Sequence, residues 1–343
     1  MKQLAVFSIL MVMVLGMAFA GGAGEDKSKP IVFVWLPNDS VPESAAFRAA
    51  VDKIVSDATG RKVVDKFTTD YNIAVEAMAT DNAGLAFFGA AQYVLAASKN
   101  KMVVPIVTNS GNSGTMADAS YFSRLLVNEA DAAQYMKDGK FAIDNIQGKR
   151  FSFVSNSSTS GFLFPATGIV SYFKKQAKWS KLTTADLIEG GSDKFFSQVL
   201  FGGSHQGSLA NLLTGKADVV AADDIDVAAY VKQIAGTDKT DPGSIYEVKS
   251  DAADPFSGVP GKRYEVIWSI PVLNGPITGN ANVLSKSELE KIQAAFMADS
   301  VMTNPDLWVV PGGKNKAAFK QTGKVRFLPV TAATYQPIVD KMK

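Results

Sequence analysis

The stretch LAFFGAAQYVLAASKNKMVVPIVT, residues 85–108, holds two short apolar runs separated by a segment with the character of a helix. Residues 85–89 and 102–108 are typical of buried strands, and residues 92–99 are predicted to form the helix between them. Strand, helix and strand in this order predict two parallel strands joined by a helical crossover. The stretch therefore favours an α/β fold with a doubly wound sheet.

The same pattern continues on both sides of this stretch. The apolar run IVFVWLP, residues 31–37, indicates a first buried strand, and KVVDKFTT, residues 62–69, alternates like a second. A helix is predicted between them over residues 42–60, and another over residues 71–79. On the C-terminal side, YFSRLLVN, residues 121–128, is predicted to be a strand that leaves this first lobe.

A second series of strands and helices begins near residue 144. It implies two doubly wound α/β lobes joined by two hinge crossings, with a cleft between them, a common position for a ligand site. We place lobe 1 at residues 30–125 plus 270–343 and lobe 2 at residues 126–269. Strands are predicted at 150–155, 194–202, 217–224 and 263–271, helices at 162–176, 206–216, 223–234 and 285–299, and a long loop at 236–261.

Residues 1–20 have the features of a secretion signal. Lys2 is the only charge before Glu25, residues 4–20 are almost wholly apolar, and the run ends in small residues, as at cleavage sites. A membrane anchor is the alternative, but the run is short for a span and ends without a basic cluster. We expect a cleaved signal peptide, a flexible leader at 21–29, and a protein that works in the periplasm or otherwise outside the cytoplasm.

The composition excludes several classes of protein. The 343 residues include 35 basic and 33 acidic side chains, so no excess of positive charge suggests a nucleic-acid partner. There is no cysteine, which excludes disulfides, zinc–thiolate sites, iron–sulfur clusters and thiol catalysis. Because His205 is the single histidine, the chain cannot form a multi-histidine metal site. We expect no cofactor and no metal.

The loop SSTSG, residues 157–161, lies between a predicted strand and a predicted helix. The first N–H groups of a helix lack partners within it, and the helix dipole adds partial positive charge there. Several hydroxyls and a glycine at such a place predict an anion site that needs no lysine. Ordinary N-capping is the alternative, which one serine would satisfy.

Other polar residues lie at comparable positions. His205, which follows Gly-Gly-Ser, and Tyr71 each stand between a strand and a helix, and Tyr121 stands at the presumed crossing between the lobes. Loops after parallel strands gather at one edge of a sheet, where ligands bind. A capping role for His205 and packing roles for the two tyrosines stay open, as do capping and acceptor roles for Asp223 and Asp224.

Five blocks of sequence carry a resemblance to a known family: DYNIAVEAM at 70–78, AFFGAAQYVLA at 86–96, YFSRLLV at 121–127, SSTSGFLFP at 157–165 and GGSHQGSLANLLTGKADVV at 202–220. Together they resemble the periplasmic phosphonate-, phosphite- and phosphate-binding proteins of ABC transporters, which are type II periplasmic binding proteins. The resemblance runs from about residue 31 to about residue 300. It implies that a phosphonate or phosphate is held by Ser158, Thr159, Ser160 and His205 from one lobe, and by Tyr71 and Tyr121 from the other.

The resemblance also implies a function without catalysis. Such proteins capture a ligand by closing two lobes, usually as monomers, and present it to a membrane permease. Members that bind 2-aminoethylphosphonate have acidic residues facing the amine. In ungapped alignment those places fall on Ile225 and Pro276, although Asp224 and Asp226 flank the first. This departure favours phosphate, phosphite or a small alkylphosphonate as the ligand.

Three other functions stay open. Ser160, His205 and Asp224 could form a hydrolase triad, although no G-x-S-x-G motif is present. The same fold could present its ligand to a membrane receptor, as a sensory module. Sulfate, a carboxylate or another organic ligand could use similar donors, but sulfate at neutral pH has no O–H to donate to Asp223 or Asp224.

Overall fold

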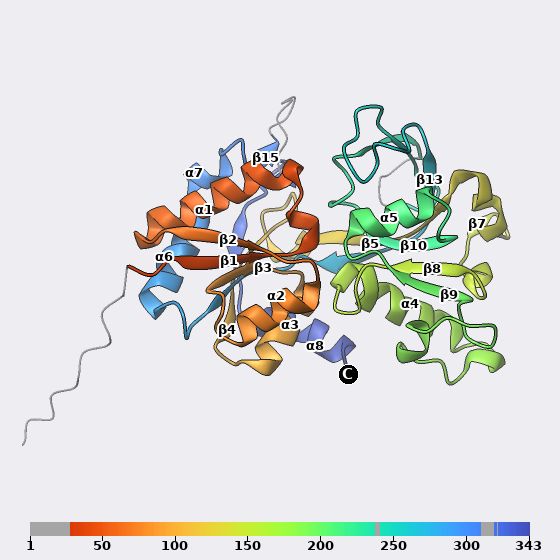
Figure 1. Cartoon of the computed structure of the whole chain (residues 1–343), viewed down its shortest axis with the longest axis horizontal. Helices are drawn as coiled ribbons and strands as arrows, with labels where there is room; N and C mark the ends of the chain where they lie inside the picture. The colour runs from red at the N-terminus through yellow and green to blue at the C-terminus, as the bar shows by residue number, and fades with distance from the viewer. Residues whose placement is uncertain (1–27, 237–240, 310–318, 321) are drawn as a thin grey trace, which may run out of the picture.

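The computed structural model describes residues 28–236, 241–309, 319–320 and 322–343. The chain forms two α/β lobes that lie side by side (Figure 1). The predicted signal peptide, and the predicted leader up to residue 27, lie outside the described residues. Within the described part, no helix is both long and apolar enough to cross a membrane.

Lobe 1 is built on a six-stranded sheet in the order β17–β4–β14–β3–β1–β2. β1 pairs in parallel with β2 and β3, as the order of elements in the sequence predicts. β14 lies antiparallel between β3 and β4, and β17 is antiparallel to β4, so the sheet is mixed. The strands are β1 (Ile31–Trp35), β2 (Val63–Phe67), β3 (Leu85–Phe87), β4 (Val103–Asn109), β14 (Ile277–Asn280) and β17 (Phe327–Pro329).

Helices cover both faces of this sheet (Figure 1). On one face, α1, α6 and α7 bury apolar residues such as Val51 and Phe296, and on the other, α2, α3 and α8 bury residues such as Val75 and Ile338. α1 ends at Gly60, which adopts the left-handed conformation that favours glycine. The helices are α1 (Ala45–Thr59), α2 (Tyr71–Ala79), α3 (Ala90–Lys99), α6 (Lys286–Phe296), α7 (Asp299–Met302) and α8 (Gln336–Lys341).

Lobe 2 is built on a seven-stranded sheet in the order β11–β12–β13–β5–β10–β8–β9. β8 is parallel to β9 and β10, whereas β5 is antiparallel to β10 and β13. α4 (Phe164–Phe173) and α5 (His205–Leu213) contribute to two separate apolar cores of this lobe. The strands are β5 (Ser120–Asn128), β8 (Arg150–Phe153), β9 (Gln198–Phe201), β10 (Val219–Asp223), β11 (Val231–Ala235), β12 (Ile245–Val248) and β13 (Arg263–Leu273).

Two long strands connect the lobes. The chain passes from β4 into β5 and returns from β13 into β14, and β5 pairs with β13 from Ser120–Leu273 to Asn128–Tyr264. The predicted lobe boundaries, at residues 125 and 270, fall inside these two strands, and the division of residues between lobes stays a prediction. Short pairs complete the described strands: β6 (Met136–Lys137) with β7 (Lys140–Phe141), and β15 (Trp308–Val309) with β16 (Phe319–Lys320).

Three predictions about individual elements are wrong. The helix predicted over 223–234 is the end of β10, a turn and β11, which lies at the sheet edge with mostly exposed side chains. The predicted loop 236–261 contains β12, and the sequence analysis predicted no strand at β17 or at β14, whose Thr278 and Asn280 are buried polar residues. The edge strand β11 and the polar central strand β14 both lack the apolar run by which the predicted strands were found.

Candidate ligand-binding site

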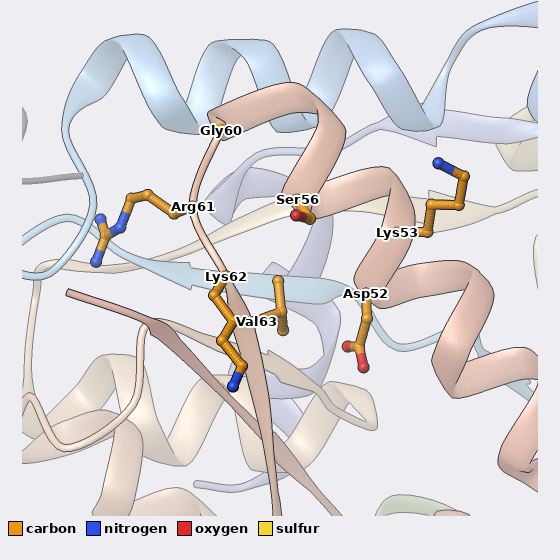
Figure 2. Close-up of a pocket in the computed structure, with 7 residues that line it drawn as sticks. All are labelled: Asp52, Lys53, Ser56, Gly60, Arg61, Lys62 and Val63. Atoms are coloured by element: carbon orange, nitrogen blue, oxygen red, sulfur yellow. The ribbon is translucent and has the colours of Figure 1, made fainter. Parts of the chain in front are cut away.

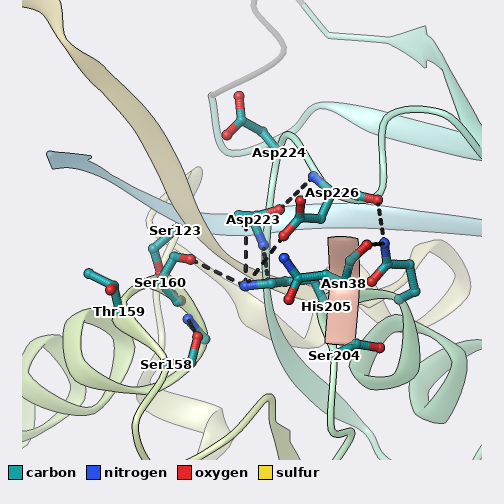
Figure 3. A network of polar contacts seen from close by, with 12 residues as sticks. Asn38, Ser123, Ser158, Thr159, Ser160, Ser204, His205, Asp223, Asp224 and Asp226 are labelled. Atoms are coloured by element: carbon teal, nitrogen blue, oxygen red, sulfur yellow. Dashed lines mark hydrogen bonds and ion pairs between the residues drawn. The ribbon is translucent and has the colours of Figure 1, made fainter. Parts of the chain in front are cut away.

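A cleft of about 800 Å³ lies between the lobes. Its walls include every residue that the sequence analysis proposed for ligand binding: Tyr71, Tyr121, Ser158, Thr159, Ser160 and His205. Figure 3 shows Ser160, Asp223 and Asp226 gathered around the ring of His205. The structure therefore brings together residues that are far apart in the sequence.

The serine-rich loop leads into α4 through one turn of π-helix, Thr159–Leu163. Ser158 caps this turn, because its Oγ accepts a hydrogen bond of 3.0 Å from the N–H of Gly161. A Cβ at Gly161 would lie only 2.3 Å from the side chain of Val154, so the turn requires glycine. Since a hydroxyl can accept and donate together, this cap does not prevent Ser158 from donating its O–H, and its role as a ligand donor stays a prediction.

Thr159 connects the two lobes. Its Oγ1 accepts from the N–H of Ala91 at 2.9 Å and donates to Oε1 of Gln92 at 3.2 Å. Gln92 also donates to the carbonyl of Ser157 at 2.8 Å. Because Thr159 has one O–H and gives it to Gln92, this geometry makes Thr159 an inter-lobe contact, and its role as a ligand donor stays a prediction.

The proton of His205 has a defined position. Its Nδ1 accepts a hydrogen bond of 3.0 Å from the backbone N–H of Asp223, so in the neutral ring the proton is on Nε2. Burial lowers the pKa of His205, against the opposing effect of Asp223, which favours this neutral form. Nε2 lies 3.4 Å from Oγ of Ser160 and 3.3 Å from Oδ2 of Asp223. His205 therefore presents an N–H donor to the cleft (Figure 3).

The two tyrosines are phenol donors. Tyr71 is the first residue of α2, is almost fully buried and donates to Oδ1 of Asn38. Burial, reinforced by nearby carboxylates such as Asp226, raises the pKa of Tyr71 well above its usual value. Burial and Asp223 likewise raise the pKa of Tyr121, on the crossing strand β5. Both side chains stay protonated at physiological pH.

The structure adds two acids that the sequence analysis did not select. Asp39, from the loop after β1, and Asp226, which follows β10, are near Asp223 and line the cleft. Burial, then Asp223, raises the pKa of Asp39 to about 7, against the opposing charge of Arg48. Burial, then Asp223 and Asp39, raises the pKa of Asp226 well above its usual range. Carboxylates from both lobes are thus crowded together, which favours proton uptake.

A signal for Asp226 was present in the sequence. Asp226 follows Ile225, and Ile225 is the position at which ungapped alignment placed the acid of aminophosphonate-binding members. A shift of the alignment by one residue therefore puts Asp226 in the place of that acid. Its Oδ2 lies 3.9 Å from Nε2 of His205, and its N–H donates to Asp223 at 2.9 Å. Asp39 lies in the loop 37–40 after the first predicted strand, a position where ligand loops gather, but no motif in the sequence marks this acid itself.

His205, Asp223 and Asp226 have ligand atoms within 4.8 Å of one another, a spacing that could hold a metal ion. The protonation of His205 argues against this use. Because Nδ1 accepts an N–H, Nε2 keeps its proton and has no lone pair for a metal. The three residues are better suited to hydrogen bonding, in which His205 donates one hydrogen bond and the carboxyl groups of Asp223 and Asp226 accept several.

The geometry also does not match a hydrolase triad. Such a triad places the carboxylate on one ring nitrogen of histidine and the serine on the other. Here Ser160 and Asp223 both lie near Nε2, while Nδ1 is taken by a backbone N–H. Asp224, the acid suggested by the sequence, instead accepts from the N–H of Phe122 at 2.8 Å.

Lobe 1 has a second hollow, of about 460 Å³, which lies apart from the cleft. Figure 2 shows it between α1 and the start of β2. Asp52 lines it, and burial and Asp65 raise the pKa of Asp52 to about 7. None of the residues proposed for ligand binding lines this hollow.

Two α/β lobes joined by paired crossing strands, with a polar cleft between them, define a type II periplasmic binding protein. The family described as ABC transporter, phosphonate, periplasmic substrate-binding protein matches residues 33–335, and the chain belongs to this family. Such proteins are the extracytoplasmic binding components of ABC importers. The fold class and the family resemblance predicted from the sequence are confirmed.

The chain is similar to the phosphate-import protein PhnD of Mycolicibacterium smegmatis, with 24% identity over 274 residues, which are 79% of this chain and 72% of that protein. It also resembles the binding-protein component of a phosphonate ABC transporter from Pseudomonas aeruginosa, with a TM-score of 0.60, 17% identity and coverage of 92% of this chain and 86% of that one. PhnD1 of Prochlorococcus marinus, solved with methylphosphonate, gives a TM-score of 0.60, 16% identity and coverage of 91% and 97%. At these identities the solved structures bear on the fold alone.

Proposed function

We propose that the protein captures a phosphorus oxyanion, closes its lobes around it and delivers it to the permease of an ABC importer. The observation that carries this proposal is the Nε2–H of His205 beside the hydroxyl of Ser160, within the cleft. We call Ser158, Ser160 and His205 the phosphoryl cradle. Tyr71, Tyr121 and Thr159 line the cleft around it, where the O–H of Tyr71 is donated to Asn38 and that of Thr159 to Gln92.

The cradle attracts an anion through neutral donors. α5 begins at His205, and the turn that leads into α4 begins at Thr159, so two helical N-termini face the same space. Their free N–H groups and dipoles favour negative charge there. Neutral donors select a ligand by the number and direction of its acceptor oxygens, and the closed cleft removes those oxygens from water.

The surrounding acids restrict the form of the ligand. Asp39, Asp223 and Asp226 act as acceptors when ionised, and Oε1 of buried Gln206 has no hydrogen-bond partner among the described residues. A ligand that fits these groups brings hydrogens of its own, as a P–OH or an ammonium group. The sequence favoured phosphate, phosphite or a small alkylphosphonate, ligands without an amine, because Ile225 stood where an acid was expected. The position of Asp226 beside His205 supports an aminoalkylphosphonate instead.

The remaining features of the proposal concern the setting. The protein acts as a monomer, reaches the extracytoplasmic space through a cleaved signal peptide at residues 1–20, and catalyses no reaction. A permease is its partner, in keeping with the family to which the chain belongs. Nucleic acid has no part in this function.

A thermal-shift comparison tests the proposal. The protein is partly unfolded, dialysed and refolded to remove carried-over ligand, then heated with phosphate, methylphosphonate, 2-aminoethylphosphonate or sulfate. A ligand present at 100 times its Kd adds about 2.7 kcal/mol of stability, and hence a shift of several degrees. We expect a shift with 2-aminoethylphosphonate and none with sulfate. A shift with sulfate alone, or with none of the four, would contradict the proposal.

Two variants locate the site in the same assay. Ser160→Ala and His205→Ala should remove most of the ligand-induced shift, measured against the empty form of each variant. His205→Ala should also lower the melting temperature of the empty protein, because it leaves the buried N–H of Asp223 without its acceptor. Ser180→Ala, at an exposed position of lobe 2, is the matched control and should behave as the wild type. If Ser160→Ala and His205→Ala instead kept the full shift, the cradle would not be the binding site.

A further inference from the structure

The cleft is much larger than the phosphoryl group and short substituent of a simple phosphonate. Its volume is about 800 Å³. At roughly 30 Å³ per water molecule in the liquid, this equals the volume of about 25 waters. An aminoethylphosphonate has the bulk of only a few of them. Most of the cleft would therefore remain filled with water around a ligand of that size.

The extra space does not arise from lobes that are apart at the cradle. Thr159 already bonds to the N–H of Ala91 across the lobes, and Gln92 bonds back to Ser157. Nε2 of Gln206, in lobe 2, lies 3.4 Å from the carbonyl of Asn38, in lobe 1. The lobes are in contact around the cradle, so the remaining volume belongs to the rest of the cleft.

Both lobes contribute apolar residues, among polar ones, to the lining of the rest of the cleft. From lobe 1, Phe47 and Phe87 meet edge to face with their ring centroids 5.6 Å apart, and Val41 lines the same cleft. From lobe 2, the segment 228–231, with the sequence Ala-Ala-Tyr-Val, begins two residues after Asp226 and leads into β11, and its Ala228 and Ala229 are exposed. Apolar side chains that two lobes contribute to one wet cleft favour an apolar group between the lobes, because such a group removes them from water.

We propose that the physiological ligand is a phosphonate or phosphate monoester whose substituent carries an apolar body the size of an aromatic ring. The phosphoryl end lies in the cradle, and the ring-sized body lies between Phe47 and Phe87 of lobe 1 and the segment 228–231 of lobe 2. Asp226 lines the cleft with its Oδ2 3.9 Å from Nε2 of His205, and it accepts hydrogens from the part of the ligand that joins the two ends. This inference rests on the proposed function, since the cradle fixes the phosphoryl end.

Two aminophosphonates that differ by one phenyl ring test the inference by titration calorimetry: 1-aminoethylphosphonate and 1-amino-2-phenylethylphosphonate. Burying an aromatic side chain is worth enough to predict a 10-fold or greater gain in affinity for the phenyl compound. Ala228→Trp fills the space between the walls from an exposed position. It should reduce the affinity for the phenyl compound at least 10-fold and change that for the smaller compound less than 3-fold.

Ala253→Trp is the control, because residue 253 is exposed on lobe 2 outside the cleft. It should leave both affinities unchanged. Equal or weaker binding of the phenyl compound, with the smaller compound bound well, would overturn the inference and leave the proposed function intact. Tighter phenyl binding that Ala228→Trp does not weaken would overturn the assigned position. If neither compound bound, the proposed function would itself fail.

Discussion

His205 illustrates how one backbone group can set the chemistry of a side chain. The N–H of Asp223 occupies Nδ1, and Arg124 in turn donates to the carbonyl of Asp223 at 2.6 Å. The strand end is thereby held against the ring, and the proton is left on Nε2. Because burial lowers the pKa of His205, the ring stays neutral to a lower pH than an exposed histidine does.

This assignment makes a prediction for substitutions of His205. His205→Ala removes a hydrogen bond to a charged ligand, worth about 1.5–3 kcal/mol, so the ligand affinity should fall roughly 10- to 150-fold. His205→Gln keeps an N–H donor on a side chain of similar reach and should recover part of the loss. Titration calorimetry measures both, and ¹⁵N NMR of the single histidine should show the Nε2–H form at neutral pH. A protonated ring at pH 7 would contradict the assignment.

Asp39 makes the stability of the empty protein depend on pH. Its pKa is raised from 3.8 to about 7 by burial and by Asp223, so between these values the folded state binds a proton that the unfolded state has lost. Stability should therefore fall as pH rises through this window, by up to about 1.4 kcal/mol per pH unit. Asp39→Asn should flatten the slope, measured by chemical denaturation from about pH 5 to about pH 8.

Asp52→Asn provides a matched control for that experiment. The pKa of Asp52 is also raised to about 7, but it lies in the hollow beside α1 (Figure 2) and not in the cleft. The Asp52→Asn variant should flatten the dependence of folding stability on pH while leaving the pH dependence of ligand binding unchanged. Asp39→Asn should alter both. An unchanged stability slope in Asp39→Asn would show that this carboxyl is ionised in the folded protein.

Single residues of the site differ in how far the sequence could predict them. Ser158, Ser160 and His205 stand where a strand turns into a helix, and that position alone indicates the sheet edge at which they meet. Asp39 becomes relevant only because its loop in lobe 1 approaches Asp223 in lobe 2. No local pattern encodes an encounter between two lobes, so the sequence could indicate the loop 37–40 after the first strand but not the role of this acid.

Between elements, the contact of α3 with the turn before α4 connects the lobes. Gln92 and Thr159 make its hydrogen bonds, and a neutral bond of this kind contributes about 0.5–1.5 kcal/mol. Gln92→Ala should lower the population of the closed form and hence weaken ligand binding about 2- to 10-fold. Titration calorimetry checks this, with Gln134→Ala, an exposed glutamine of lobe 2, as the control. Equal affinities for the two variants would exclude a role for this contact in closure.

The elements themselves were predictable where an apolar pattern marks them. The predicted helix 71–79 coincides with α2, and β5 begins one residue before the predicted strand 121–128. Among the strands of the two large sheets, the failures lie in β11, β12, β14 and β17. β11 exposes most of its side chains at a sheet edge, and β14 buries Thr278 and Asn280, so neither resembles an apolar strand.

For the whole molecule, the order of elements predicted two lobes, but it did not predict that a strand following lobe 2 is inserted into the middle of the lobe 1 sheet. β14 returns after lobe 2 and enters the lobe 1 sheet between β3 and β4, antiparallel to both. Sequence adjacency favours pairing of β3 with β4, and only the path of the second crossing shows that a distant strand separates them. The crossings β5 and β13 therefore hold the lobes through a shared ladder of paired residues.

Lobe closure can be followed because the chain contains no cysteine. Asn72 in lobe 1 and Asn156 in lobe 2 are exposed and lie in contact across the cleft, with Nδ2 and Oδ1 3.2 Å apart. Spin labels on Asn72→Cys and Asn156→Cys should give a short distance with ligand and a longer, broader distribution without it. Ser98→Cys with Asn72→Cys, both in lobe 1, should give one distance throughout. A ligand-independent distance across the lobes would rule out capture by closure.

The measurement that tests the central claim most directly is a crystal structure of the protein with 2-aminoethylphosphonate. We expect the phosphonate oxygens within about 2.7–3.2 Å of Oγ of Ser160 and Nε2 of His205, with the ammonium group facing Asp226. A phosphonate bound outside the cleft, or one held in it without contact to His205, would contradict the account.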